Sequence, residues 1–379
     1  MRDLVEIGMG RTARRAYHFD DVEIVPSRRT RTSRDVSTAW QIDAYRFEIP
    51  LVTHPTDAIV SPPVAVRIGE LGGLGVLNAE GLWARHSNVD ELLFRLATAA
   101  DEAEPSTAVR MLQQWHAAPL RVDLLAEAIK QVAEAGVTVA ARVSPQRARE
   151  LTPDLIAAGV EVLIVQGTII SAEHVSRTAV GGTTPLNLKE FIAELDVPVI
   201  AGGVGDYRTA MHLMRTGAAG VIVGYGAGKA TSTGDVLGIG VPMATAVVDA
   251  AAARRDYLDE TGGRYVHVIA DGGVETSGDV ARAVACGADA VMLGEPLARA
   301  AEAPGNGWYW TSAAAHPSVP RSWVELAEDA SVTLDTLLFG PSADPSGAVN
   351  LFGALRRAMA KTGYSDLKEF QKVGLSVRS

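Results

Sequence analysis

The sequence predicts an α/β fold, a TIM-type (β/α)₈ barrel made by one domain over residues 1–379. Three observations predict it. Short apolar runs recur along the chain, helical patterns separate them, and the chain length is normal for a barrel with insertions. The runs are too short for helices and lack polar alternation, which is typical of strands buried on both faces.

The order of the elements distinguishes a closed barrel from an open sheet. Helical patterns occur at 124–135, 147–158, 207–216 and 277–287. Strand and helix alternating at this spacing indicate βαβ units, and eight units favour a closed barrel. The alternative is a doubly wound sheet, but no Gly-x-Gly-x-x-Gly follows the first predicted strand. The predicted strands lie near residues 49, 75, 138, 161, 197, 220, 266 and 290.

Two longer segments connect or follow these units, and neither indicates a domain boundary. Residues 83–121 are predicted to form a polar, helical connection between strands two and three. Residues 299–349 are rich in Trp, Pro, Ser and Gly, and are predicted to form an extended loop region after strand eight. A basic N-terminal arm is interpreted as a solvated face rather than a ligand site; its arginines are Arg28, Arg29, Arg31 and Arg34.

Composition excludes several classes of protein. The net charge of −10 argues against broad nucleic-acid binding, although backbone amides could still hold a small phosphorylated ligand. No apolar run is long enough to cross a membrane, and the N-terminus lacks the pattern of a secretory signal. The single cysteine, Cys286, excludes an intrachain disulfide and a Cys-rich metal site. We therefore expect a cytoplasmic protein without a bound metal centre.

The segment 269–305 holds the candidate site, because the chemistry of a barrel gathers where its strands end. Asp271 follows predicted strand seven and could accept two ribose hydroxyls. Gly272, Gly273 and Gly294 would let a phosphate approach the backbone. In the alternative interpretation, Asp271 and Gly272 only form a tight turn and Gly294 only packs. Both interpretations remain open from the residues alone.

Aromatic residues follow the last predicted strand at Trp308, Tyr309 and Trp310, with His316 beyond them. They could form a stacking wall for a purine. Packing beneath a long loop is the interpretation that we favour.

Four segments resemble the IMP dehydrogenase/GMP reductase family. Residues 269–305 resemble its Ala-Asp-Gly-Gly-Ile…Gly-Ala-Asp-x-Val-Met-x-Gly…Glu-Ala-Pro-Gly run, and 19–28 resemble its Phe-Asp-Asp-Val-x-x-x-Pro. Residues 72–82 resemble its Gly-Gly-x-Gly-Val, and 351–370 its C-terminal Gly-Leu-Arg…Met…Gly segment. The resemblance covers nearly the whole chain and fits best the branch without the regulatory CBS-domain insertion, found in actinobacteria and cyanobacteria.

This resemblance implies several ligands and partners. It implies binding of a purine nucleotide (IMP, XMP or GMP), a nicotinamide cofactor (NAD or NADP), and a monovalent cation at the loop 226–234. It also implies a homo-oligomer, a tetramer or octamer of barrels, which could include a true IMP dehydrogenase.

The chain departs from the family in the catalytic loop after strand six. The family reads Gly-Pro-Gly-Ser-Ile-Cys-Thr-Thr-Arg there, and residues 226–243 keep the framing Gly226 and Gly228. Thr231 stands at the cysteine position, and Lys229 replaces the serine that contacts phosphate. In the family a thiolate attacks purine C2. A thiol ionises near about pH 8.5, whereas a threonine hydroxyl is far less acidic and needs a dedicated base.

Other departures affect the cofactor and phosphate sides. Gln166 stands where the family has an acid after strand four, and Gly203 where it has an asparagine after strand five. Both changes remove groups that position the nicotinamide. Glu295 replaces a small residue near the phosphate, and a carboxylate about 5 Å from a phosphate is repelled by roughly 3 kcal/mol per unit charge. Lys229 could pair with Glu295 or bind the phosphate itself; alternatively, the pair closes the site.

Three functions follow, in this order. The first is a purine-nucleotide-binding barrel that has lost thiolate chemistry and acts as a regulator or partner in purine nucleotide metabolism. The second is an oxidoreductase on IMP or GMP that uses NAD or NADP by a route without cysteine. The third is a structural assembly protein with a closed site.

Overall fold

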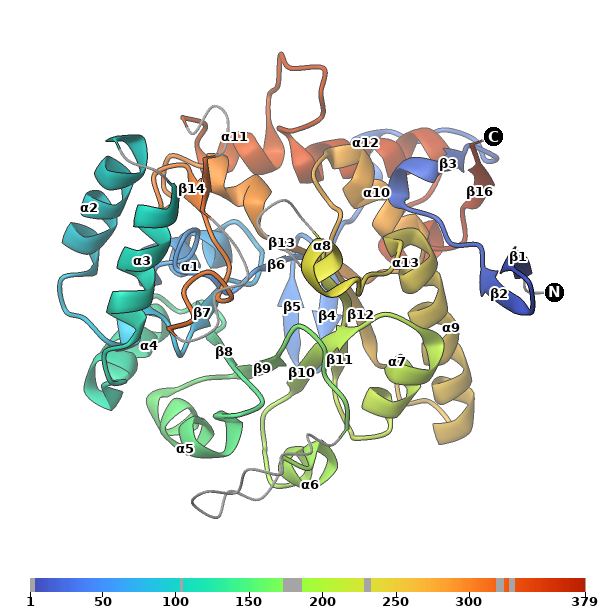
Figure 1. Cartoon of the computed structure of the whole chain (residues 1–379). Helices are drawn as coiled ribbons and strands as arrows, with labels where there is room; N and C mark the ends of the chain where they lie inside the picture. Colours follow the sequence, from blue (N-terminus) through green and yellow to red (C-terminus); the bar gives the residue numbers. More distant parts are fainter. Residues whose placement is uncertain are drawn as a thin grey trace.

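A computed structural model describes residues 4–102, 105–172, 186–227, 233–317, 324–326 and 331–378. Its centre is an eight-stranded parallel sheet in the order β6-β13-β12-β11-β10-β9-β8-β7 (Figure 1). A parallel bridge between Val52 and Leu74 joins the two ends of this order and closes the ring. The predicted fold, a single-domain (β/α)₈ barrel without a CBS domain, is confirmed.

Each barrel strand lies at its predicted place along the chain. The strands are β6 (Leu51–Thr53), β7 (Val76–Asn78), β8 (Ala140–Val143), β9 (Val162–Gln166), β10 (Val199–Val204), β11 (Gly220–Ala227), β12 (His267–Gly272) and β13 (Ala290–Leu293).

Helices surround the barrel and cover the outer face of its strands (Figure 1). Local capping fixes where several of them begin: Asp206 and Thr276 each accept a hydrogen bond from the third helical amide in a capping box. The helices are α1 (Pro62–Glu70), α4 (Val122–Glu134), α5 (Ala148–Ala158), α6 (Leu188–Ala193), α7 (Tyr207–Met214), α9 (Met243–Thr261), α10 (Ser277–Ala285) and α12 (Leu351–Thr362).

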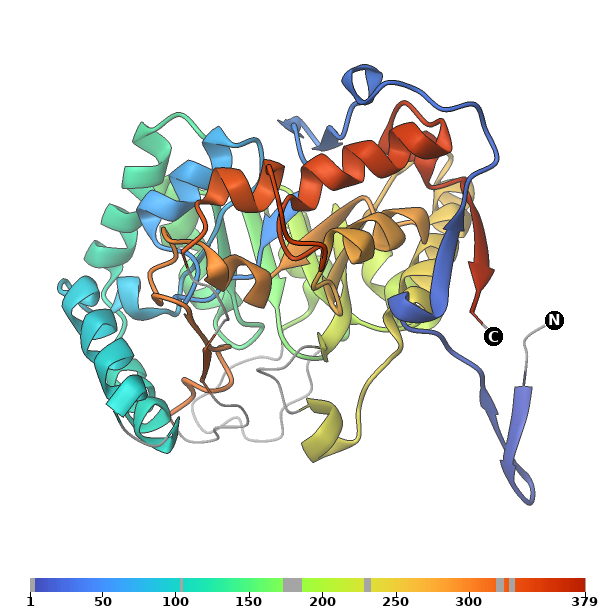
Figure 2. The same cartoon turned by 90° about the horizontal axis from the view of Figure 1, so that it is seen from above.

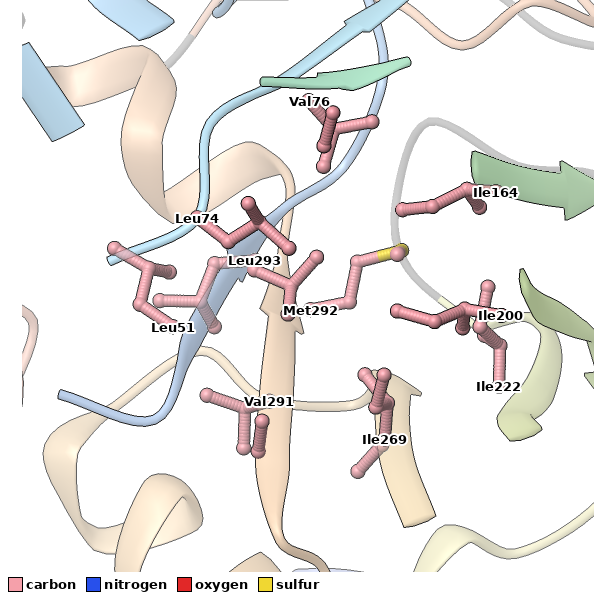
Figure 3. Packing of buried hydrophobic residues seen from close by; sticks show 14 of the residues in the cluster. Leu51, Leu74, Val76, Ile164, Ile200, Ile222, Ile269, Val291, Met292 and Leu293 are labelled. Atoms are coloured by element: carbon pink, nitrogen blue, oxygen red, sulfur yellow. The ribbon is translucent and has the colours of Figure 1, made fainter. Parts of the chain in front are cut away.

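Branched side chains fill the interior of the barrel, as Figure 3 shows. Ile164, Ile200, Ile222 and Ile269 come from successive strands, and Met292 lies among them. These side chains are 1% exposed or less. The barrel is therefore a packed core rather than a pore, and any ligand must bind at its rim.

The connection 83–121 is helical, as predicted, and contains α2 (Val89–Glu102) and α3 (Pro105–His116), preceded by η3 (Leu82–Ala84). The prediction of an extended loop over 299–349 is wrong in part. That region contains β14 (Trp308–Tyr309) paired with β15 (Glu325–Leu326), and α11 (Leu334–Phe339). Elements of two and six residues are too short to leave a periodic pattern in the sequence.

The N-terminal segment forms several small elements outside the barrel. The β1–β2 hairpin projects from the body (Figure 2), and β3 pairs with the C-terminal strand β16. The β4–β5 hairpin covers the amino-terminal end of the barrel, where the rings of Trp40 and His267 lie 5.9 Å apart. The bounds are β1 (Leu4–Gly8), β2 (Arg11–Arg14), η1 (Phe19–Asp21), β3 (Val22–Val25), η2 (Ser33–Asp35), β4 (Trp40–Ile42), β5 (Tyr45–Phe47), α13 (Leu367–Phe370) and β16 (Gly374–Val377).

The four arginines of the basic N-terminal arm are exposed, as predicted, and two of them also contact the C-terminal segment. The Arg28 guanidinium lies 4.3 Å from the ring centre of Tyr364, and Arg31 donates from Nε to the carbonyl of Gly363 at 2.9 Å. These two contacts hold the arm against the C-terminal segment while its guanidinium groups stay exposed to solvent.

Candidate functional site

A cavity of about 400 Å³ lies at the carboxyl ends of the barrel strands. Polar side chains from four of these ends line it: His54 beyond β6, Arg142 on β8, Gln166 on β9 and Asp271 on β12. Ligands of (β/α)₈ barrels bind at this face, and the volume is typical of a small-molecule site. The cavity is therefore the candidate functional site.

Asp271 is the acid of this cavity. It is partly buried at the end of β12, and its Oδ2 accepts a 2.9 Å hydrogen bond from Nε2 of Gln166. The surrounding protein shields the carboxylate from water, which raises the pKa of Asp271 to about 7, while the bond from Gln166 opposes the rise. Asp271 therefore changes its charge near neutral pH.

Gln166 connects β9 with β12 across the barrel. Besides its bond to Asp271, its Nε2 lies 3.6 Å from Sδ of Met292. Gln166 is only 8% exposed, and no described residue hydrogen-bonds to its Oε1. A buried acceptor without a partner is costly. A ligand hydroxyl or amide that donates to Oε1 would remove this cost.

Glycines allow the strands to approach each other closely below the cavity. A Cβ atom on Gly224, whose φ is +140°, would lie 2.0 Å from the carbonyl oxygen of Asp271. Gly203 links the ends of β10 and β9: its amide donates to Gly167 at 2.9 Å, and its carbonyl accepts from Ile170 at 3.1 Å. Gly167 and Ile170 line the cavity, so the hydrogen bonds of Gly203 hold two residues of the cavity wall in place.

Arg142 and Glu80 form a largely buried ion pair beside the cavity. Their side chains are 11% and 16% exposed, with a 3.3 Å contact between them. Arg142 also donates to the carbonyl of Gln166 at 2.7 Å, and Glu80 accepts from the amide and hydroxyl of Ser144 at 2.6 and 2.9 Å. Burial lowers the pKa of Arg142, and Glu80 counteracts this. The pair fixes the ends of β8 and β9 and adds no net charge.

His54 is the fourth polar side chain of the cavity. Burial, and secondarily the charge of Arg142, lower the pKa of His54 to about 4, so the ring is neutral at neutral pH. No described residue bonds to its buried Nδ1. Sequence reasoning missed His54, Arg142 and Glu80. The available signals were a histidine directly after a predicted strand and an arginine inside an apolar run.

The other predicted residues of strands seven and eight lie beside the cavity rather than in its lining. Gly272 ends β12 and Gly273 follows it; Gly294 precedes η4 (Glu295–Arg299), which Glu295 opens. Tyr309 lies close to this corner, since a Cβ atom on Gly294 would meet its hydroxyl. Burial raises the pKa of Tyr309, and the carboxylates of Asp271 and Glu295 raise it further.

The aromatic run packs rather than lining the cavity. Tyr309 and Trp310 are buried, and the carbonyl of Trp310 accepts the Thr56 hydroxyl at 2.6 Å. These positions agree with the packing interpretation. His316 lines a second cavity.

The predicted residues of the loop after strand six are mostly outside the described residues. Gly226 lies within them and lines the cavity. Gly228, Lys229 and Thr231 lie outside them, as does most of the 226–234 loop expected to hold a monovalent cation. The short helix α8 (Thr233–Leu237) follows, and its two end residues line the cavity.

A second cavity of about 920 Å³ adjoins the first. The two share Arg142, Gly167, Thr168 and Ser312 in their walls. The second extends toward His116 and the segment after α3. The strand ends thus offer two neighbouring compartments.

Cys286 lies away from both compartments. It is buried at the C-cap of α10, from which the chain enters the amino end of β13. Burial raises the pKa of its thiol to about 12. Because the chain contains no other cysteine, no cysteine side chain lines either compartment.

The described ranges contain neither a cluster of metal-ligating side chains nor a membrane-spanning helix. There, no group of three or more His, Cys, Asp or Glu side chains is arranged to hold a metal ion. No helix in the described part of the chain has both the length and the apolar character needed to cross a membrane.

Comparison with known proteins provides a family context. The model of the "IMP dehydrogenase / GMP reductase domain" matches residues 16–316. A Mycolicibacterium smegmatis protein named "Uncharacterized oxidoreductase" is 65% identical over 379 residues, covering 99% of this chain and all of that protein. A Mycobacterium leprae protein with a similar name is 64% identical.

More distant relatives and a solved structure agree with this match. An inosine-5′-monophosphate dehydrogenase from Korarchaeum cryptofilum is 26% identical, covering 77% of this chain and 76% of the relative. The crystal structure of an "IMP dehydrogenase/GMP reductase-like protein" from Corynebacterium glutamicum has a TM-score of 0.93 and 56% identity, covering 99% of this chain and 98% of that one.

Proposed function

Since the chain belongs to the IMP dehydrogenase/GMP reductase family, we propose that its cavity binds a purine nucleotide (IMP, XMP or GMP) without forming a thiolate adduct. In this proposal the protein acts as a regulator or partner in purine nucleotide metabolism rather than as a conventional IMP dehydrogenase or GMP reductase.

The observation that carries the proposal is the pair of acceptors formed by Asp271 and Gln166. The Asp271 carboxylate and Oε1 of Gln166, to which no described residue hydrogen-bonds, belong to residues that line one cavity. A ribose has two adjacent hydroxyls, each able to donate one hydrogen bond. Hydrogen bonds to an ionised carboxylate are stronger than neutral ones. This acceptor set suits the sugar of a nucleotide.

The single cysteine of the chain supports the second half of the proposal. Cys286, the only cysteine, is buried at the opposite end of the barrel with a raised pKa. Thr231, at the position of the family's nucleophile, carries a hydroxyl that would need a dedicated base. Of the four polar groups described above, His54 is a weak base because its pKa is lowered to about 4, Arg142 is paired with Glu80, and Asp271 is assigned to the ribose in this proposal.

A second candidate function is an oxidoreductase that uses NAD or NADP without cysteine, and the adjoining 920 Å³ cavity favours it by its size. When bound, a nicotinamide accepts or donates a hydride. The residues present do not fit this cofactor well. Nε2 of Gln166 already donates to Asp271. Gly203 has no side chain, and its backbone amide and carbonyl are hydrogen-bonded to Gly167 and Ile170. The oxidoreductase is therefore the second candidate function.

Titration calorimetry with IMP, XMP, GMP, GTP, ATP, NAD and NADP tests the proposal. We expect at least one purine monophosphate to bind, and Asp271→Asn to weaken that binding about 10- to 100-fold, because hydrogen bonds to the carboxylate are lost. Asp154→Asn, which removes an exposed carboxylate on α5, is the matched control and should bind like the wild type.

Each remaining outcome selects a different function. Nucleotide-dependent reduction of NAD or NADP, or oxidation of the reduced form, would favour the oxidoreductase. Absence of binding by every purine monophosphate would overturn the proposal and favour an assembly protein with a closed site. Equal affinity of the wild type and Asp271→Asn would place the nucleotide elsewhere.

A further inference from the structure

The second cavity, of about 920 Å³, has a positively charged lining in a chain whose net charge is −10. Three arginines contribute to it: Arg85, Arg142 and Arg147. The only carboxylate in the described lining is that of Glu80, which pairs with Arg142. Arg147 pairs with Glu150 of α5. Among the described residues, Arg85 is therefore the one arginine of this lining without an acidic partner.

Arg85 is hydrogen-bonded only to backbone carbonyls in the described part of the chain. Its Nε donates to the carbonyl of Glu80 at 3.2 Å, and its Nη1 donates to the carbonyl of Ala118. A guanidinium carries five N–H donors, so more than half of its donors remain for a ligand. Burial lowers the pKa of Arg85, and the neighbouring charge of Arg147 lowers it further, although two nearby carboxylates oppose this. An anion between the two guanidiniums would stabilise the charged form against both effects.

The fold holds Arg85 in place at the wall of the cavity. Arg85 directly follows η3, and its amide donates to the carbonyl of Leu82 at 2.9 Å. The amide of Leu82 in turn donates to the buried carboxylate of Asp57 at 3.1 Å. Asp57 also lies 3.4 Å from Nε2 of His116, another residue of the lining. A cation that is already fixed by the fold loses little conformational entropy when a ligand binds to it.

The remaining lining indicates the size and chemistry of the ligand. Thr168 and Ser312 add hydroxyl groups, and Gln146 adds an amide. Arg147 is the N-cap of α5 and makes no side-chain capping bond, so the amino end of this helix, which favours negative charge, borders the cavity. No Phe, Tyr or Trp is among the described lining residues, whereas nucleic-acid bases are commonly held by stacking on such rings. The lining therefore suits a small polar anion better than a dinucleotide.

We propose that the second cavity binds a small organic anion without a base, whose oxyanion group lies between the guanidiniums of Arg85 and Arg147. The oxyanion is a carboxylate or a phosphate ester, because either group accepts paired hydrogen bonds from a guanidinium. Since the two cavities share a wall, this anion borders any ligand of the first cavity. The site requires neither a nucleotide nor a nicotinamide cofactor, so it does not depend on the function proposed above.

Titration calorimetry with inorganic phosphate and with citrate, each at an ionic strength held constant with chloride, tests this site on the full chain. At least one of the two anions should bind to the wild type. Arg85→Gln should weaken that binding about tenfold or more, because charge-assisted hydrogen bonds are lost. Arg208→Gln, which removes an exposed arginine of α7, is the matched control and should bind like the wild type.

A second variant tests the same site without removing the hydrogen bonds of Arg85. Ala117 is an exposed residue of the lining, and Ala117→Glu adds a carboxylate to the cavity. Repulsion of the ligand and pairing with Arg85 should weaken anion binding about tenfold or more. Circular dichroism shows whether each variant is folded, and Ala117→Glu decides the question if Arg85→Gln has lost its fold.

The relative affinities of the two anions identify the source of the oxyanion. Binding of phosphate alone supports a phosphate ester, binding of citrate alone supports a carboxylate, and binding of both supports a site that accepts either. Absence of binding by both anions would overturn the proposal, as would binding that neither substitution weakens. If only NAD or NADP binds, and Arg85→Gln weakens that binding, the cavity belongs to a dinucleotide and the proposal is wrong.

Discussion

Replacing Asp271 by asparagine should stabilise the protein in a pH-dependent manner. In the folded chain, the surrounding protein raises the pKa of this carboxyl from 3.8 to about 7. Between these values the folded state holds a proton that the unfolded state has released, so the stability of the wild type falls as pH rises. Above pH 7 the folded chain bears the full cost of an ionised, shielded carboxylate. Asparagine is neutral throughout, and Gln166 can turn Oε1, which has no partner among the described residues, toward the new amide.

The pKa shift fixes the size of the effect. One pKa unit corresponds to about 1.4 kcal/mol, so a shift from 3.8 to about 7 corresponds to about 4 kcal/mol at pH 8 and almost nothing near pH 4. With an unfolding entropy of roughly 2.1 cal/mol/K per residue over 379 residues, this corresponds to a rise in Tm of about 5 °C.

Thermal unfolding followed by circular dichroism, for the wild type, Asp271→Asn and the surface control Asp154→Asn, measures this effect. The difference in the free energy of unfolding between Asp271→Asn and the wild type should grow by about 1.4 kcal/mol per pH unit between about pH 4 and 7. Above pH 7 it should stay constant. The control should show no such slope. A Tm difference that is independent of pH, or a variant less stable than the wild type at pH 8, would refute the reasoning.

Three further predictions concern the same barrel. Nucleotide affinity should fall about tenfold per pH unit below pH 7, because ligand hydroxyls require the ionised Asp271; calorimetry should find a flat profile for Asp271→Asn. Asp289→Asn should lower the free energy of unfolding in urea by about 3–5 kcal/mol, because Arg254, 2.7 Å away and buried, would lose its counter-charge; an unchanged urea midpoint would contradict this. Gly224→Ala should abolish nucleotide binding and cost about 1–3 kcal/mol, because its φ of +140° and the nearby carbonyl leave no room for Cβ; wild-type melting and affinity would disprove it.

The barrel could be predicted from the sequence because each of its strands and helices leaves a pattern within a short segment of the chain. Each buried strand shows as a β-branched run, such as that around Ile222, and each helix as a periodic segment. Side-chain contacts between segments far apart in the chain leave no recognisable pattern in the sequence. The bond from Gln166 to Asp271 spans 105 residues, and the pair of Glu80 and Arg142 spans 62. Sequence reasoning reached Asp271 through its place after predicted strand seven and Gln166 through the family resemblance, but nothing indicated that their side chains meet.

The free-energy cost of keeping an ionised carboxylate at Asp271 also bears on the function of the protein. A protein with a closed, purely structural site would gain stability by replacing this carboxylate, whereas this chain keeps the acid of the family motif although its only cysteine lies elsewhere. Residues that destabilise a fold are tolerated where function uses them. A ligand that donates hydrogen bonds to ionised Asp271 would offset the cost of burying its charge. If Asp271→Asn is both more stable at pH 8 and weaker in nucleotide binding, the same carboxylate lowers stability and provides affinity, which only a binding function explains.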